Sequence, residues 1–214
     1  MAMIDLLLPP ACAGCGRVGE LLCPRCRRAF RPPFDSAHRF VVADAGIVLG
    51  DALSLAVAAF AYEGPLRRAL AALKYTGASR LAGPLADASF ERMDDLLALT
   101  GPAALVPVPV HVERRRSRGY DQAELIAARI AARTRLPTQS VLERVRPTTK
   151  QHGLSRAARL ANLRDAFAVR TSAPSRVILV DDIITTTATL ETCAAVLRRN
   201  GTETVYGFSV AREV

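Results

Sequence analysis

The stretch of sequence that decides the fold is Val177-Ile-Leu-Val-Asp-Asp-Ile-Ile-Thr-Thr-Thr-Ala-Thr-Leu190. Its first four residues predict a buried strand, and two carboxylates, Asp181 and Asp182, follow at the end of that strand. A threonine-rich turn then leads into a helix that we expect over residues 185–200. The free N–H groups and partial positive charge of a helix start favour a phosphate. The stretch therefore predicts a phosphate site beside a strand of an α/β sheet.

The two acids can accept hydrogen bonds from sugar hydroxyls next to such a phosphate. Successive strand residues point to opposite faces, which argues against two carboxylates acting across one glycosidic bond. In a purely structural interpretation, the acids end the strand and a threonine caps the helix. Adjacent charges and four threonines in five positions favour ligand binding instead; these threonines are Thr185, Thr186, Thr187 and Thr189. The sequence has neither a nucleotide P-loop nor a dinucleotide-binding glycine pattern.

Strand-like apolar runs alternate with amphipathic helices along the rest of the chain. We expect strands at 52–62, 104–110, 141–146 and 204–210, and a loop at 111–118. One helix is expected to begin at residue 64, and three others are expected over 81–99, 120–134 and 155–163. This alternation implies right-handed crossovers and a mostly parallel sheet, in which ligands bind at the carboxyl ends of the strands. The sequence thus predicts an α/β domain over residues 40–214.

Four of the five cysteines form two Cys-x-x-Cys pairs, Cys12 with Cys15 and Cys23 with Cys26. Each pair brings two thiolates to one turn, and the short spacer lets both turns face one ion, which predicts a tetrahedral metal site. Structural Zn²⁺ is the favoured interpretation, with an iron site or a dithiol redox pair as alternatives. A segment of about thirty residues has no hydrophobic core of its own, so metal binding would stabilise a finger over residues 1–32. Cys193 is expected to pack in the core.

The composition of the 214 residues is globular, with 50% hydrophobic and 23% charged residues and a net charge of +9. Neither a membrane-spanning run nor a secretory signal stands out, so we expect a cytoplasmic protein without membrane insertion. The positive charge favours polyanions such as nucleic acid or phosphorylated small molecules, although a plain solvated basic surface would have the same charge.

Three regions carry basic residues that can contact phosphate. The densest run, Arg114, Arg115 and Arg116 followed by Arg118, indicates capture of a small-molecule or nucleic-acid phosphate, or else a solvated loop. A second group surrounds Lys150. Lys74 can contact phosphate or simply end a helix. Tyr75 and Tyr120 flank basic residues and are candidates for base stacking. Two tyrosines are a small basis for a platform that binds a single strand.

The strand, acid and threonine stretch resembles the phosphoribosyl pyrophosphate (PRPP) loop of type I phosphoribosyltransferases. Together with the four-cysteine finger, Val106-Pro-Val-Pro-Val110 and Arg118-Gly-Tyr-Asp-Gln-Ala123, it makes nearly the whole chain resemble the ComF/GntX family of competence-associated, phosphoribosyltransferase-like proteins. The resemblance implies a type I phosphoribosyltransferase-like parallel sheet flanked by helices, with a small N-terminal zinc-ribbon-like finger.

The resemblance also implies a role for each candidate residue. Asp181 and Asp182 would hold the ribose hydroxyls of PRPP, and the four threonines would surround its 5′-phosphate. Mg²⁺ would bridge the pyrophosphate, and residues 142–167 would form a mobile hood. Further contacts to phosphate or pyrophosphate would come from Lys74, Pro107, Val108, Arg118 and Lys150. The implied activity is glycosyl (phosphoribosyl) transfer to an unknown acceptor, linked to the handling of incoming single-stranded DNA.

Two residues depart from the family pattern. Thr187 stands where the family usually has glycine, which permits a positive φ and close approach of the backbone to phosphate; a threonine is harmless there only with helical φ. Asp121 stands where asparagine is usual and adds negative charge near the pyrophosphate unless Arg118 or a metal neutralises it. The alternatives to an enzyme are a non-catalytic module that binds single-stranded DNA or a DNA-processing protein, and a PRPP sensor. The acceptor and the oligomeric state stay open.

Overall fold

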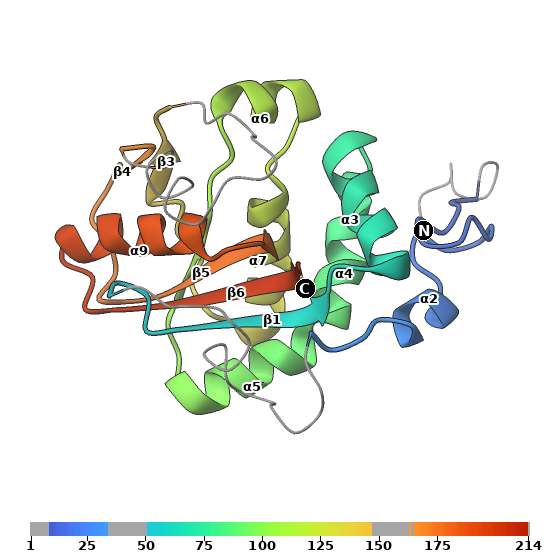
Figure 1. Ribbon diagram of the computed structural model, residues 1–214, viewed down its shortest axis with the longest axis horizontal. Coiled ribbons are helices and arrows are strands. Elements are labelled where there is room, and N and C mark those ends of the chain that lie inside the picture. Colours follow the sequence, from blue (N-terminus) through green and yellow to red (C-terminus); the bar gives the residue numbers. More distant parts are fainter. Residues whose placement is uncertain (1–8, 34–50, 147–162, 164, 214) are drawn as a thin grey trace.

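The centre of the protein is a four-stranded parallel sheet with the strand order β1-β6-β5-β2 (Figure 1). The computed structural model describes residues 9–33, 51–146, 163 and 165–213. The four strands are β1 (Leu55–Ala61), β2 (Ala104–Pro107), β5 (Arg176–Ile184) and β6 (Thr204–Arg212). Every neighbouring pair runs parallel. This confirms the predicted α/β fold with a mostly parallel sheet flanked by helices.

Alternate residues of β5 pack against different helices, so both faces of the sheet are covered. Ile178 and Val180 belong to the buried cluster of α3, α4, α5 and α7, whereas Val177 and Leu179 pack with α9. These helices are α3 (Gly64–Tyr75), α4 (Ala82–Ala88), α5 (Phe90–Thr100), α7 (Gln122–Thr134) and α9 (Ala188–Arg199). Cys193, on α9, is fully buried as expected. Among the helices of the described residues, none is long and apolar enough to cross a membrane.

The expected loop at 111–118 was wrong, because Val112–Arg118 is the helix α6. The helix begins after His111, whose Nδ1 accepts a hydrogen bond from the Glu113 N–H at 3.4 Å, and it ends at Gly119 with φ 82°. Both end signals are in the sequence, but the charged helix between them lacks an apolar stripe. A run of arginines without that periodicity resembles a loop.

The expected helix over 81–99 is interrupted. A short 3₁₀ turn, Ser79–Leu81, precedes α4, and Ser89 separates α4 from α5. The Ser89 hydroxyl donates to the Ala86 carbonyl at 3.0 Å, which offers the backbone an alternative to a continuous helix. Two short strands, β3 (Leu142–Arg144) and β4 (Phe167–Val169), pair antiparallel beside α9. The helix expected at 155–163 lies outside the described residues except for Leu163.

The described N-terminal residues 9–33, called the four-cysteine module below, contain the short helix α2 (Pro24–Arg28) and lie against α3 (Figure 1). Arg68 on α3 donates from Nε to the Gly14 carbonyl at 2.6 Å. A Cβ at Gly14 would lie 3.0 Å from the Pro65 Cβ, so the two segments touch closely. Cys12, Leu22, Cys23 and Cys26 share one buried cluster with Leu66 and Leu70. The module therefore packs on the core of the α/β domain.

Candidate functional site

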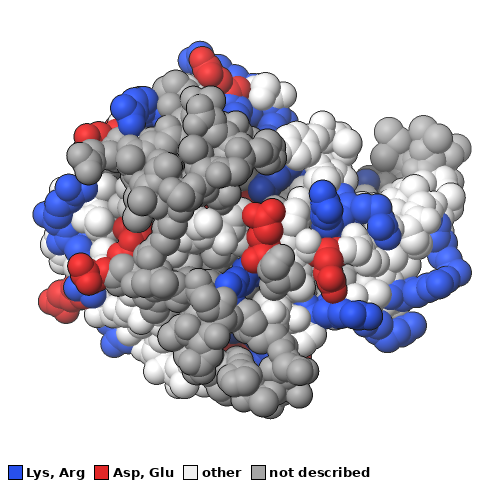
Figure 2. All heavy atoms as spheres, viewed as in Figure 1, with Lys and Arg blue, Asp and Glu red and all other residues white. Residues whose placement is uncertain are grey.

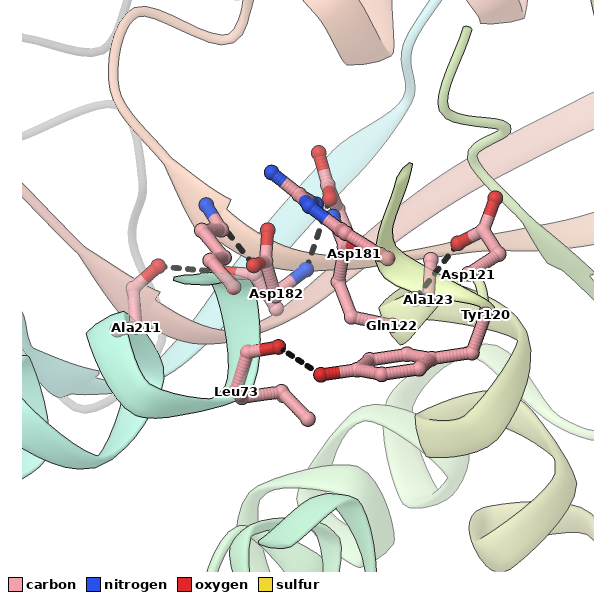
Figure 3. A network of polar contacts seen from close by, with 11 residues as sticks. Leu73, Tyr120, Asp121, Gln122, Ala123, Asp181, Asp182 and Ala211 are labelled. Atoms are coloured by element: carbon pink, nitrogen blue, oxygen red, sulfur yellow. Dashed lines mark hydrogen bonds and ion pairs between the residues drawn. The ribbon is translucent and has the colours of Figure 1, made fainter. Parts of the chain in front are cut away.

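Asp181 and Asp182 lie within β5, which continues to Ile184, so the expectation that they follow the end of the strand was wrong. The Asp182 N–H donates to Asp181 Oδ1 at 2.8 Å (Figure 3). Asp182 is 2% exposed and meets Lys74 from α3, whereas Asp181 is partly exposed and interacts electrostatically with Arg144 and Cys193. The adjacent acids thus serve opposite sides of the sheet, as the strand period requires.

The Lys74 ammonium forms an ion pair with Asp182 at 2.8 Å between Nζ and Oδ2. Burial lowers the pKa of Lys74, but the nearby Asp182 and Asp181 outweigh it and raise that pKa, so the amine stays charged. Burial and the neighbouring Asp182 raise the pKa of Asp181 well above its ordinary value, against the opposing charge of Lys74. Lys74 therefore lies both at the end of a helix and in the candidate site. An additional cation or hydroxyl donor beside Asp181 would be stabilised there.

The threonine turn places Thr187 in a left-handed conformation, with φ 55° and ψ −11°. Its hydroxyl donates to the Thr186 carbonyl at 2.6 Å, and its carbonyl accepts the Glu191 N–H at 2.8 Å. A threonine would be harmless here only with a right-handed helical φ, and Thr187 does not have one. The left-handed conformation of a non-glycine residue carries a strain of roughly 1–2 kcal/mol. Helix α9 begins at Ala188, three residues later than expected. Thr185, Thr186 and the strained Thr187 form the turn, and Thr189 lies in the first helical turn.

The segment after β2 is tied to the start of α7 by Asp121. Pro107 pairs with Val180, and the Val108 N–H donates to the Val180 carbonyl at 2.9 Å. Asp121 Oδ2 accepts the Val110 N–H at 2.9 Å, while Oδ1 accepts the N–H groups of Ala123 at 2.9 Å and Glu124 at 3.5 Å.

Asp121 is 2% exposed, and burial raises its pKa although the backbone donors oppose this. Its carboxylate thus caps α7 through the N–H groups of Ala123 and Glu124, and it also holds the Val110 N–H. The sequence interpretation treated Asp121 only as a charge near pyrophosphate and missed this structural role. Its signal was the capping pattern of Asp121 followed by Glu124 at the third helical position. Arg118 bonds Gln122 Oε1 at 2.7 Å instead of neutralising Asp121.

Lys74 also lines a pocket of about 410 Å³ between the end of α3 and α6. The other lining residues are Tyr75, Gly77, Arg114, Ser117 and Arg118. The Arg118 guanidinium lies 5.6 Å from the centre of the Tyr75 ring. The structure thus brings Lys74 and Arg118, two of the predicted phosphate contacts, to one pocket, whereas Lys150 lies outside the described residues.

The three consecutive arginines of α6 have different surroundings. Arg114 lines the pocket, Arg115 forms a two-point ion pair with Glu124 at 2.8 Å, and Arg116 is exposed. Burial is the largest cause that lowers the pKa of Arg144, and the positive charge of Arg114 is the second. Arg114 on α6 and Arg144 on β3 therefore repel one another. Lys and Arg side chains gather at the top of Figure 2, where Figure 1 places α6.

Tyr120 lies at the start of α7 and is already engaged. Its hydroxyl donates to the Leu73 carbonyl at 2.5 Å (Figure 3). Burial raises its pKa, which keeps the hydroxyl protonated as a donor. Tyr120 therefore links α7 to α3, and of the two candidate tyrosines only Tyr75 lines the pocket.

The four cysteine sulfurs of the module all lie within 4.8 Å of one another, and those of Cys15 and Cys23 are 3.7 Å apart. Tetrahedral zinc with Zn–S bonds of about 2.3 Å requires sulfurs about 3.8 Å apart, so the spacing fits. Burial opposes ionisation of Cys12, but N–H donors from Cys23, Gly14 and Cys15 outweigh it and lower its pKa to about 6. Burial and the crowded neighbouring thiols raise the pKa of Cys26 to about 12, an effect that a bound cation would reverse. The four cysteines can hold a metal ion such as zinc.

The fold and site together define a class: a parallel α/β protein with two acids on β5, a threonine turn after that strand, and a cluster of four cysteines that could hold a metal ion, packed against the core. No protein-family model matches the chain. The chain is 37% identical over 116 residues to Competence protein F of Haemophilus influenzae, covering 52% of this chain and 51% of that protein. The match thus spans about half the length of that relative.

Longer alignments lead to a second group of relatives. The chain is 32% identical over 156 residues to DNA utilization protein YhgH of Salmonella typhi, which covers 71% of this chain and 69% of the relative. It is 26% identical over 206 residues to the protein of that name from Escherichia coli K12, covering 94% and 88%. The chain belongs to the ComF family.

Proposed function

We propose that this protein binds PRPP with Mg²⁺ at the carboxyl edge of its sheet and transfers the phosphoribosyl group to an acceptor. One observation carries the proposal: Asp181 and Asp182 lie on β5 beside the threonine turn that opens α9, and Lys74 pairs with Asp182 at 2.8 Å. A phosphate suits the turn and the helix start, and ribose hydroxyls suit the acids.

The residues of the site divide the ligand between them. Thr185, Thr186, Thr187 and Thr189 surround the 5′-phosphate, and the acids accept hydrogen bonds from the ribose. The segment from Pro107 and Val108, with Arg118, faces the pyrophosphate. Bound Mg²⁺ would neutralise pyrophosphate charge, and carboxylate oxygens are ligands that this ion prefers. As pyrophosphate leaves C1, a nucleophile of the acceptor takes its place, so the protein contributes positioning and electrostatic stabilisation.

The biological setting proposed for this chain is DNA uptake or use, in the cytoplasm. Its support is the names of the relatives, Competence protein F and DNA utilization protein YhgH. The four cysteines would hold a structural zinc ion that stabilises a finger over residues 1–32. Single-stranded DNA and a DNA-processing protein are the partners that this setting favours.

Calorimetric titration of the zinc-loaded protein with PRPP and Mg²⁺ tests the proposal. We expect micromolar binding that is lost in the double variant Asp181→Ala/Asp182→Ala. The matched control is Asp94→Ala/Asp95→Ala, which removes an adjacent acid pair from α5 with the same change of charge. Binding that survives loss of Asp181 and Asp182, or no binding by the unaltered protein, would overturn the proposal. Release of pyrophosphate with an acceptor distinguishes an enzyme from a PRPP sensor.

A second candidate function is a non-catalytic module that binds single-stranded DNA. The observation that favours it is the basic helix α6, where Arg114 lines a pocket and Arg116 is exposed. Such a module binds oligonucleotides with a steep salt dependence, because phosphate contacts release counterions. Neutralising Arg114, Arg115 and Arg116 should weaken binding and flatten the salt dependence. If neither changes, α6 is not the DNA site.

A further inference from the structure

Helix α3 lies between the four-cysteine module and the proposed PRPP site (Figure 1). It has 12 residues and is therefore about 18 Å long. Near its C-terminal end, the Lys74 ammonium pairs with Asp182 at 2.8 Å. The Leu73 carbonyl beside it accepts the Tyr120 hydroxyl at 2.5 Å. The position of the cation that faces the acids of β5 thus depends on how α3 is held along its length.

The module holds the first half of α3. Arg68 donates from Nε to the Gly14 carbonyl at 2.6 Å, and a Cβ at Gly14 would lie only 3.0 Å from the Pro65 Cβ. Three of the cysteines share a buried cluster with Leu66 and Leu70, which are 1% and 0% exposed. Because Gly14 stands inside the first Cys-x-x-Cys pair, a change in that turn acts directly on α3.

One sulfur of the cluster is open to solvent. Cys15 is exposed, whereas the other three cysteines of the module are buried. The Cys15 sulfur lies 3.7 Å from that of Cys23, which belongs to the second Cys-x-x-Cys pair. A disulfide bond requires a separation of about 2.0 Å, so the two sulfurs need to approach by about 1.7 Å. An oxidant from solvent therefore meets Cys15 first and finds a second thiol within reach.

We propose that Cys15 and Cys23 form a redox-sensitive pair, and that its oxidation by a peroxide frees the metal ion and weakens PRPP binding through α3. The proposal rests on the proposed function of the site and adds a control to it. The Cys15 thiolate attacks one oxygen of hydrogen peroxide, the O–O bond breaks, and a sulfenic acid and hydroxide result. The Cys23 thiolate then attacks the Cys15 sulfur, the S–S bond forms, and a second hydroxide leaves. The two thiolates lose two electrons, the peroxide gains them, and two protons from solvent convert both hydroxides into water.

Oxidation consumes two of the four thiolate ligands. Cys12 and Cys26 alone leave a tetrahedral site half complete, so the metal ion is released and no longer stabilises the module. The turn around Gly14 then loosens, and the hydrogen bond from Arg68 is lost with it. Reduction of the disulfide and renewed metal binding restore these contacts. The coupling is reciprocal, so bound PRPP should in turn make the metal ion harder to remove.

The test compares the full, zinc-loaded chain before and after treatment with hydrogen peroxide. A chromogenic chelator should report the release of about one zinc ion per chain, and peptide mapping should find a disulfide between Cys15 and Cys23. Hydrogen exchange should become faster in residues 9–33 and in α3. The PRPP affinity from calorimetry should fall about five-fold or more and should return after addition of dithiothreitol and zinc. Cys193→Ala removes the one cysteine outside the module and should respond like the unaltered protein.

The matched pair Arg67→Ala and Arg68→Ala tests the route through α3. Both variants remove an exposed arginine from neighbouring positions of the helix. Arg68 donates to the Gly14 carbonyl, whereas the Arg67 guanidinium lies 5.9 Å from the centre of the Tyr62 ring. We expect oxidation to change the PRPP affinity of Arg68→Ala less than that of Arg67→Ala, which should keep the full response. Equal responses of the two variants would overturn the route through α3.

The remaining outcomes separate this proposal from the proposed function. Zinc that stays bound after peroxide treatment, or a disulfide that does not contain Cys15, overturns the redox pair. A disulfide that leaves hydrogen exchange in α3 or the PRPP affinity unchanged overturns the control. If the reduced protein does not bind PRPP, the proposed function fails. Zinc release and hydrogen exchange in α3 need no PRPP, so they still decide whether the redox pair acts on α3.

Discussion

The ion pair between Lys74 and Asp182 provides a quantitative test of how the site is held together. Its Nζ–Oδ2 distance is 2.8 Å, and the two side chains are 18% and 3% exposed. Lys74→Met keeps most of the aliphatic length and leaves the Asp182 carboxylate without its cation. Breaking a buried pair in this way costs about 3–5 kcal/mol, and the partial exposure of Lys74 moves the expectation toward about 3 kcal/mol. For a chain of this length that lowers Tm by roughly 6–12 °C.

A double-mutant cycle measures the pair itself. Urea denaturation gives the unfolding free energies of Lys74→Met, Asp182→Asn and the double variant. The loss in the double variant should be smaller than the sum of the two single losses by about 2 kcal/mol, which is the coupling energy of the pair. The matched control is the ion pair of Arg129 with Asp87, which has the same 2.8 Å distance but side chains 52% and 29% exposed. An exposed pair of this kind contributes little to stability, because water screens its charges.

The comparison isolates burial, because the two pairs share their distance and differ in exposure. A coupling energy for Lys74 and Asp182 no larger than that of Arg129 and Asp87 would refute the reasoning. Lys74 would then be a surface lysine that ends α3, and its contact with Asp182 would contribute nothing to the site.

Further predictions address single features of the site and the module. The pKa of Asp181 is raised above its unfolded value, so the folded protein binds the extra proton and stability falls as pH rises from about 4. Asp181→Asn should flatten this dependence in urea midpoints; parallel curves contradict it. Thr187→Gly relieves roughly 1–2 kcal/mol of left-handed strain, but it removes a hydrogen bond and raises the conformational entropy of the unfolded chain. The Tm should therefore change little, whereas the affinity for phosphate should rise. Thr187→Ala should be less stable than Thr187→Gly. Asp121→Ala leaves three backbone N–H groups without their acceptor and should cost about 2 kcal/mol or more in urea denaturation; a neutral result refutes its capping role. Chelation of the metal should lower Tm and speed hydrogen exchange in residues 9–33; an unchanged melting curve counts against a structural site.

Local pattern predicted most of the elements. The apolar run 177–180 became part of β5, and the helix expected over 120–134 is α7, Gln122–Thr134. Two of the failures have different physical origins. Helix α6 carries no apolar stripe, so only its end signals at His111 and Gly119 could have indicated it. Asp121 was interpreted by its charge, although its position before α7 decides its role.

The sequence alone determined the features that depend on neighbours along the chain. The spacing of Cys12, Cys15, Cys23 and Cys26 specifies a four-sulfur cluster, and the order of strand, acids and threonines specifies the candidate site. Both can be predicted because the residues of each pattern lie close together along the chain. Only the tertiary structure decided which distant groups meet. Lys74 reaches Asp182 because α3 packs on the face of β5 that carries this acid, and α6 directs Arg114 but not Arg116 into the pocket with Tyr75. Such contacts follow from the packing of helices on the sheet, and no local periodicity encodes that packing.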